Sequence, residues 1–110
     1  MSLVPMDFDD GNFTEVPLSV NSSYIDANYS KCYSNGKICI VSLCFHVSSL
    51  PSSVATNMIT GFPSNSNQNY GSVATSGKAG ARIRILSGAL QFEDLPSGAT
   101  WCDGNMTYVI

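Results

Sequence analysis

The chain has 110 residues, of which 44% are hydrophobic and 12% charged, and its formal net charge is −3. This length accommodates one domain with a single core. The acidic balance and the five scattered basic residues argue against nucleic-acid binding, which requires clustered Lys and Arg. No apolar run approaches the roughly 20 residues of a membrane span, so we expect no membrane segment.

The first residues predict an irregular arm. Met1–Leu3 is too short and uncharged for a signal peptide and fits a cloning remnant. The next segment, VPMDFDDGNFTEVP, is acidic and lacks periodicity. We therefore expect residues 1–14 to form an arm or linker and residues 15–110 to form the folded domain.

The stretch KCYSNGKICIVSLCFHV, residues 31–47, predicts a β-hairpin. Asn-Gly is a strong hairpin signal, because both residues of a two-residue turn then need a positive φ. With Asn35-Gly36 as that turn, the register has three successive pairs: Ser34 with Lys37, Tyr33 with Ile38, and Cys32 with Cys39.

The strand after this turn alternates between two faces. One face is plainly core and carries Cys39, Val41, Leu43, Phe45 and Val47. The other face is also largely apolar and carries Ile38, Ile40, Ser42, Cys44 and His46. This composition predicts a strand that is covered on both sides.

A second hairpin is centred on Ser87-Gly88. Its predicted pairs are Leu86 with Ala89, Ile85 with Leu90, Arg84 with Gln91, Ile83 with Phe92, and Arg82 with Glu93. The apolar residues then share one face, and Arg82 lies opposite Glu93 on the other. Two independent patterns thus favour one register.

Further strands are predicted at residues 14–20, 56–60, 72–75 and 107–110, separated by segments rich in Ser, Asn, Pro and Gly. No amphipathic helix of ten or more residues is evident. Many short strands with frequent turn signals predict an all-β fold, an antiparallel β-sandwich of the jelly-roll type in a single domain.

The cysteines and the histidine do not predict a metal site or a cofactor. Zinc sites use closely spaced pairs such as C-x2-C, whereas the spacings here are C-x6-C and C-x4-C, with Cys102 far away. Cys39 and Cys44 point to opposite faces of a strand. A Cys32–Cys39 disulfide stays open, but the predicted register makes them a hydrogen-bonded pair whose side chains diverge. We expect buried, free thiols.

Catalysis is not predicted either. His46 as a base would need a nucleophile and an orienting acid, and Ser42 lies about two pleats away on the same strand face. Glu93 and Asp94 are adjacent, so they diverge in a strand and do not form the paired carboxylates of a glycosidase. We expect a protein that is not an enzyme.

The loop GFPSNSNQNYGS has a composition suited to hydroxyl-rich ligands. It places the amides of Asn65, Asn67, Gln68 and Asn69 beside Tyr70. Planar amides can bond to hydroxyl groups at their edges, and an aromatic face can stack on a sugar. An ordinary solvated loop explains the same composition.

The order of four segments, GKICIVSLCF, ITGFP, ARIRILSGALQF and GATWCDGNMTYVI, resembles C-terminal head domains of bacteriophage tail fibres and baseplate receptor-binding proteins. Such heads close on a G-x-x-W-x-x-G-x-x-x-Y strand, here Gly98, Trp101, Gly104 and Tyr108. The resemblance covers about residues 36–110. The cysteines and the short segment Gly61-Phe62-Pro63 depart from the usual pattern of such heads. These departures leave the position of a sugar site open.

The resemblance implies a jelly-roll homotrimer that binds a bacterial surface saccharide without catalysis. Such a protein is made in the bacterial cytoplasm and acts outside the cell at the virion tail tip. Low charge and a strand apolar on both faces also favour self-association.

The saccharide site predicted on this basis is shallow, with two aromatic platforms and four polar side chains: Tyr70, Trp101, Asn67, Gln68, Asn69 and Asp103. Trp101 is expected just before a turn at Asp103-Gly104, although a buried core anchor fits a lone tryptophan equally well. Two other functions stay open. One is a ligand-free trimerisation or capping module of a virion fibre, and the other is a secreted jelly-roll signalling ligand of the tumour-necrosis-factor or C1q type.

Overall fold

The computed structural model describes residues 13–110, except the side chain of Lys78. The predicted arm therefore falls, up to residue 12, outside the described residues. The described chain contains strands and loops and no helix. The strands are β1 (Thr14–Glu15), β2 (Ser19–Val20), β3 (Ile25–Asn28), β4 (Lys31–Ser34), β5 (Ile38–Val47), β6 (Ile59–Thr60), β7 (Asn69–Thr75), β8 (Lys78–Leu86), β9 (Ala89–Phe92) and β10 (Thr100–Val109).

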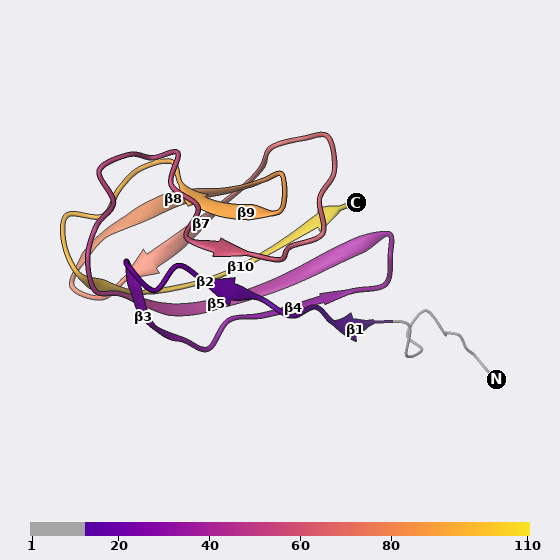
Figure 1. The fold of residues 1–110 in the computed structure, drawn as a ribbon, viewed down its shortest axis with the longest axis horizontal. Helices are drawn as coiled ribbons and strands as arrows, with labels where there is room; N and C mark the ends of the chain where they lie inside the picture. Colours follow the sequence, from indigo (N-terminus) through magenta and orange to yellow (C-terminus); the bar gives the residue numbers. More distant parts are fainter. Residues whose placement is uncertain (1–12) are drawn as a thin grey trace.

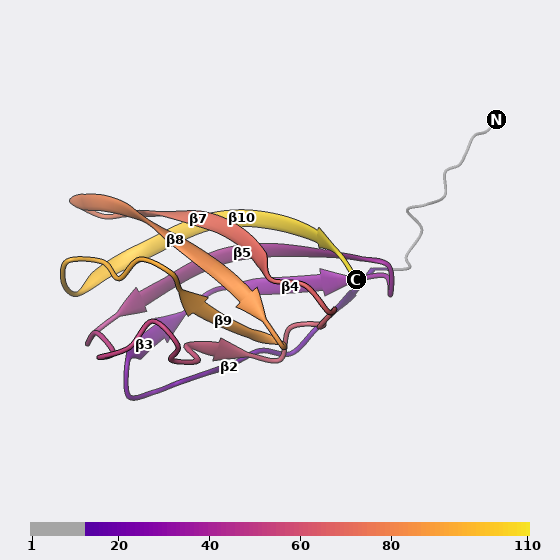
Figure 2. The same ribbon diagram turned by 90° about the horizontal axis from the view of Figure 1, so that it is seen from above.

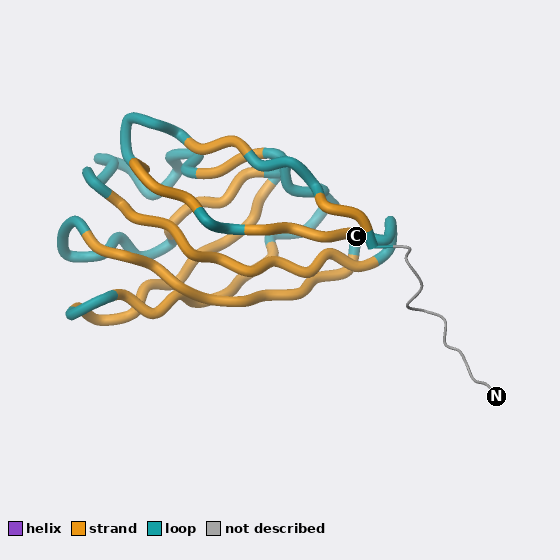
Figure 3. Tube along the Cα trace, turned by 90° about the horizontal axis from the view of Figure 1, so that it is seen from below, coloured by secondary structure: helices purple, strands orange, loops and turns teal. Residues whose placement is uncertain are grey.

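All ten strands belong to one antiparallel sheet. Its order is β1-β4-β5-β10-β7-β8-β9-β6-β2, and β3 pairs with β5 beside β4 (Figure 1). The sheet curls into a half-barrel, as the views from above and below show (Figures 2 and 3). The prediction of an all-β antiparallel fold in a single compact domain is confirmed.

The inner face of the half-barrel holds the core. Every second residue of β5 from Cys39 to Val47 is almost fully buried, as the alternation predicts. Phe45 of β5 meets Phe92 of β9 across the interior, with ring centroids 6.2 Å apart. The two halves of the curled sheet thus bury their apolar faces against each other.

The second hairpin has the predicted register. Its four backbone pairs run from Ile83–Phe92 to Leu86–Ala89. The two turn residues, Ser87 and Gly88, both have positive φ, 52° and 82°. Arg82 and Glu93 form the predicted ion pair, with 3.0 Å between Nε and Oε1.

The first hairpin forms, but its predicted register is wrong by two residues. Asn35 lies at the start of the turn, and its Oδ1 accepts hydrogen bonds from the backbone N–H groups of Lys37 (2.9 Å) and Ile38 (2.8 Å). The central residues are therefore Gly36 and Lys37, with only Gly36 at positive φ, 89°. A glycine at the first central position is typical of a type II′ turn.

The shifted register changes the surroundings of the cysteines. Cys32 pairs with Val41, and Cys39 pairs with Ser34. Cys32 and Cys39 are thus diagonal neighbours whose side chains meet, with their Sγ atoms 3.2 Å apart, rather than the divergent pair that we predicted. All four cysteines are free thiols, as expected.

All four further strand predictions needed other boundaries. The strand predicted at 56–60 is shorter, β6, and the one predicted at 72–75 is longer, β7. The segment 14–20 divides into β1 and β2 around Pro17, and the two strands pair with opposite edges of the sheet, β4 and β6. The last strand is longer than predicted, because the expected turn at Asp103-Gly104 lies inside β10. Gly104 serves close approach instead, since a Cβ there would lie 2.6 Å from the carbonyl oxygen of Ser72 in β7.

The outer face of β5 is not covered by the described chain. Ile38 and Ile40 are 37% and 43% exposed. Their outer-face neighbours Tyr33 and Val109 are also exposed. We call these four residues the apolar end cluster, because they lie at the end of the molecule that holds the β4–β5 turn and the C-terminus (Figure 1).

A substitution at Gly61, which directly follows β6, tests the close contact between this residue and the segment that joins β1 to β2. Gly61 has φ of 106°, and a Cβ there would lie 2.5 Å from the carbonyl oxygen of Pro17. We expect Gly61→Ala to lower the free energy of unfolding by about 3 kcal/mol, because it adds a backbone clash to the strain of a positive φ. Urea unfolding followed by circular dichroism measures the change.

Gly36→Ala is the matched control for that substitution. Gly36 also has a positive φ, but a Cβ there would meet nothing within 4 Å. We expect a loss of about 1 kcal/mol, from backbone strain alone. Equal losses in the two variants would contradict the close contact between Gly61 and the segment joining β1 to β2.

Candidate functional site

The structure separates the two predicted aromatic platforms. Trp101 in β10 and Tyr70 in β7 both lie on the outer face of the sheet, 37% and 46% exposed. The pairing of Cys102 with Thr75 and of Asp103 with Ala74, continued along the strands, places Tyr70 level with Thr107. The two rings are therefore about six residues, or roughly 20 Å, apart along the strands. They cannot belong to one small site.

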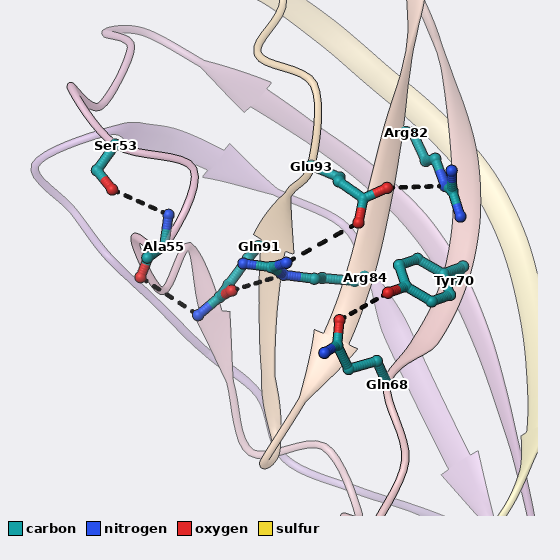
Figure 4. Close-up of polar contacts among 8 residues, drawn as sticks. All are labelled: Ser53, Ala55, Gln68, Tyr70, Arg82, Arg84, Gln91 and Glu93. Atoms are coloured by element: carbon teal, nitrogen blue, oxygen red, sulfur yellow. Dashed lines mark hydrogen bonds and ion pairs between the residues drawn. The ribbon is translucent and has the colours of Figure 1, made fainter.

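Tyr70 is engaged by its own chain. Its hydroxyl donates a hydrogen bond to Oε1 of Gln68 (2.7 Å), as Figure 4 shows. The guanidinium carbon of Arg82 lies 4.4 Å from the centroid of the Tyr70 ring. Arg82 therefore covers one face of the ring, and one predicted hydroxyl-binding amide is already used.

The polar network continues from Arg82 across β8 and β9 (Figure 4). Glu93 also lies 3.9 Å from Arg84, whose Nε donates to Oε1 of Gln91 (2.9 Å). Gln91 is 7% exposed, and its amide donates to Oδ1 of Asn57 (2.8 Å) and to the carbonyl of Ala55 (3.2 Å). This network ties the loop before β6 to the sheet, so its role is structural.

Of the other amide side chains predicted to bind a ligand, those of Asn65 and Asn69 are used in contacts within the chain. Asn69 donates to Oδ1 of Asn65 (3.1 Å), and Asn65 donates to the carbonyl oxygen of Val109 (2.6 Å). These contacts hold the loop before β7 against the end of β10. The backbone N–H of Asn67 also bonds to Asn65, and its side chain is exposed.

Trp101 belongs to a second group, which the loop composition did not indicate. Its ring stacks with that of Tyr29, with centroids 6.1 Å apart and an interplanar angle of 16°. His46, its direct partner in β5, is tilted against it with centroids 5.1 Å apart. We call Tyr29, His46 and Trp101 the aromatic patch. Trp101 is thus not the buried core anchor that was the alternative.

Two carboxylates flank the aromatic patch. Asp26 Oδ1 lies 2.6 Å from Nδ1 of His46, which fixes the orientation of the imidazole. Asp103 shares the outer face of β10 with Trp101 and lies opposite Cys44. Tyr29 is held against β5, because its backbone N–H donates a hydrogen bond to the carbonyl oxygen of Cys44 (2.7 Å).

Three side chains around Trp101 were not predicted as candidates for a binding site: Tyr29, Asp26 and His46. His46 was judged only as a catalytic base. Asp26 lies in β3 and Tyr29 directly follows it. No alternation indicated this strand, and its pairing with β5 contains a register shift between Ile25 and Ala27. An outward-facing Trp101 could have been found from the buried alternation of Cys102, Met106 and Tyr108.

The thiols of Cys32, Cys44 and Cys102 are held in their neutral form. Burial, and then the contact with Cys39, raises the pKa of Cys32 to about 12. Burial also raises the pKa of Cys102 to about 12. The Cys44 thiol is partly exposed, and hydrogen bonding to Asp103 raises its pKa. Low thiolate character makes these groups poor nucleophiles at neutral pH.

Within residues 13–110, no three His, Cys, Asp or Glu side chains are placed to hold a metal ion. No enclosed pocket is found in this part of the chain. No helix among these residues is long and apolar enough to cross a bilayer. The candidates for a binding surface are thus three exposed groups: the aromatic patch, Tyr70 with its contacts, and the apolar end cluster.

Comparisons with known proteins gave no match: neither the protein-family models, nor the curated proteins, nor the solved structures contain one.

The buried thiols predict a loss of stability at alkaline pH. The folded pKa values of Cys32 and Cys102 lie above the ordinary thiol value of 9.0. Above pH 9 the unfolded chain releases protons that the folded chain keeps, so the free energy of unfolding falls as pH rises from about 9 to 12. Urea midpoints at pH 8, 9, 10 and 11 measure the decline. Cys102→Ala should make it shallower, and an unchanged slope would contradict this account.

Proposed function

We propose that this chain is the receptor-binding head of a phage or prophage tail protein that binds a host cell-surface saccharide without catalysis. The resemblance in four segments supports the choice of family, and the aromatic patch supports the choice of binding surface. The head would act at the virion tail tip, outside the bacterium in whose cytoplasm it is made. Of the two predicted platforms, Trp101 is kept in the proposed site and Tyr70 is not.

The stacked pair of Tyr29 and Trp101 is the observation that carries the proposal. Tyr29 is 69% exposed, which leaves much of its ring open to solvent. Exposed aromatic faces stack on the apolar C–H faces of sugar rings, while Asp103, Asp26 and His46 can bond to hydroxyl groups. An offset aromatic contact is worth about 1 kcal/mol beyond burial. A small polar ligand must first shed its water, so the affinity for one small sugar should be near millimolar, ~4 kcal/mol.

We further propose that the curled sheet is a jelly-roll-like sandwich, opened at one side. The contact between Phe45 and Phe92 supports two facing layers, one built around β5 and β10 and the other around β8 and β9. The link between β1 and β2 supports closure, because it runs between the two edges of the sheet.

The head is proposed to be a homotrimer, and the apolar end cluster is the surface that supports association. Its members, Tyr33, Ile38, Ile40 and Val109, are cross-strand neighbours on β4, β5 and β10. Three copies on one tip would raise avidity without new contacts. The same cluster also favours the second candidate, a ligand-free trimerisation module of a virion fibre.

The saccharide prediction is tested with host cell-wall polysaccharide. Trp101→Ala and Tyr29→Ala should each weaken binding about fivefold to tenfold, because each removes a stacking face. Isothermal titration or a pull-down with purified cell walls measures the loss, and circular dichroism confirms folding.

Tyr70→Ala is the matched control, since it removes an exposed aromatic ring from the same sheet face. We expect it to bind almost as well as the unchanged protein. A loss in Tyr70→Ala with none in Trp101→Ala would return the site to β7. If no cell-wall glycan binds at all, the structural module replaces the adhesion function.

The trimer prediction is tested by light scattering, which should give about three times 11.7 kDa. Ile40→Glu should shift the protein to monomers, because it places a charge inside the apolar end cluster. Ser72→Glu, on the same outer face but outside the cluster, should leave the trimer intact. A monomer for the unchanged chain at high concentration would contradict the trimer.

A further inference from the structure

Two carboxylates, Asp26 and Asp103, flank the aromatic patch. The ion pairs among the described side chains are Lys31–Glu15, His46–Asp26, Arg82–Glu93 and Arg84–Glu93. Asp103 belongs to none of them, so its carboxylate has no basic partner among these side chains. The patch itself contains one nitrogen base, the imidazole of His46, which already bonds to Asp26.

The geometry places one carboxylate within reach of a ligand on the rings. Trp101 and Asp103 are two residues apart in β10 and project from the same face, which corresponds to roughly 7 Å. Their direct partners on the neighbouring strand β5 are His46, opposite Trp101, and Cys44, opposite Asp103. A ligand of sugar size that lies on Trp101 or Tyr29 can therefore also reach Asp103.

The charges of this surface complement a cation. The faces of aromatic rings are negative, and a cation within about 6 Å of a ring centroid is attracted to them. The carboxylate of Asp103 adds a full negative charge on the same surface. An anionic ligand would instead face repulsion from Asp103 and Asp26, together with a chain of net charge −3.

Tyr70 provides an internal comparison. A cation already occupies one face of its ring, because the guanidinium of Arg82 lies 4.4 Å from the centroid. No described Lys or Arg side chain lies over Tyr29 or Trp101 in the same way. Trp101 is already contacted by Tyr29 and His46. Tyr29, which is 69% exposed, is therefore the ring of the aromatic patch that leaves open the position that Arg82 takes at Tyr70.

We propose that the aromatic patch selects a saccharide that bears a positively charged amino group, with its sugar face on Tyr29 and Trp101 and its ammonium group beside Asp103. This inference rests on the proposed saccharide-binding function and adds the chemical class of the ligand. The ligand class is an amino sugar, and neutral and acidic sugars bind less tightly.

The test compares two sugars that differ in charge. The methyl glycoside of N,N,N-trimethylglucosamine has a charge that does not depend on pH, and that of N-acetylglucosamine is its neutral counterpart. Trp101 is the only tryptophan, so its fluorescence reports binding at the patch directly. We expect the charged sugar to bind about fivefold more tightly at low salt, which corresponds to about 1 kcal/mol from a cation–π contact.

Two substitutions with the same change of charge separate local from general attraction. Asp103→Asn should lower the preference for the charged sugar about twofold to fivefold, because it removes the facing carboxylate. Asp94→Asn removes an exposed carboxylate after β9, three strands away from β10 in the sheet order, and should leave the preference unchanged. Urea unfolding checks that both variants are folded.

The outcomes distinguish this inference from the proposed function. Equal or tighter binding of the N-acetyl sugar would overturn the amino-sugar inference and leave saccharide binding standing. Binding of tetramethylammonium, with no binding of either sugar, would support the cation site and overturn the saccharide function. No fluorescence response to any of the three probes would overturn both.

Discussion

The pairing of β5 with β10 over ten successive residue pairs is the constraint on which the other features depend. Side chains alternate strictly along both strands, so one register decides which residues enter the core and which face outward. If β5 kept its core face, a slip of β10 by one residue would turn Trp101 inward and expose Cys102, Met106 and Tyr108. The core, the aromatic patch and the apolar end cluster are thus three consequences of a single register.

Turn chemistry explains why one hairpin was predicted correctly and the other was not. At Ser87-Gly88 two patterns, apolar pairing and the Arg82–Glu93 charge pair, required the same register. At Asn35-Gly36 only the dipeptide indicated where the turn lies. A shift of the pairing by two residues leaves the same side chains on the core face, so the alternation of apolar residues could not reveal the shift. The side chain of Asn35 then decided the turn by accepting two backbone hydrogen bonds. Such a local competition is not visible in the alternation.

The candidate site was only partly predictable for a related reason. The sequence singled out Trp101 and Tyr70 as candidate platforms, with a buried core anchor as the alternative for Trp101, and both are exposed. Their partners come from elsewhere in the chain: Tyr29 through an irregular pairing of β3 with β5, and Arg82 through β8. A sequence read locally gives the side chains of a site, whereas long-range pairing decides which of them meet.

The position of these surfaces on the half-barrel favours a division of roles. The apolar end cluster, the β4–β5 turn and the C-terminus lie at one end of β5 and β10 (Figure 1). The aromatic patch lies near the start of β10, at the opposite end of the same two strands. Association at the first end would therefore leave the rings of Tyr29 and Trp101 accessible. Because the two strands are continuous, copies held together at one end would present their patches in a fixed geometry, which is the condition for avidity in a weak binder.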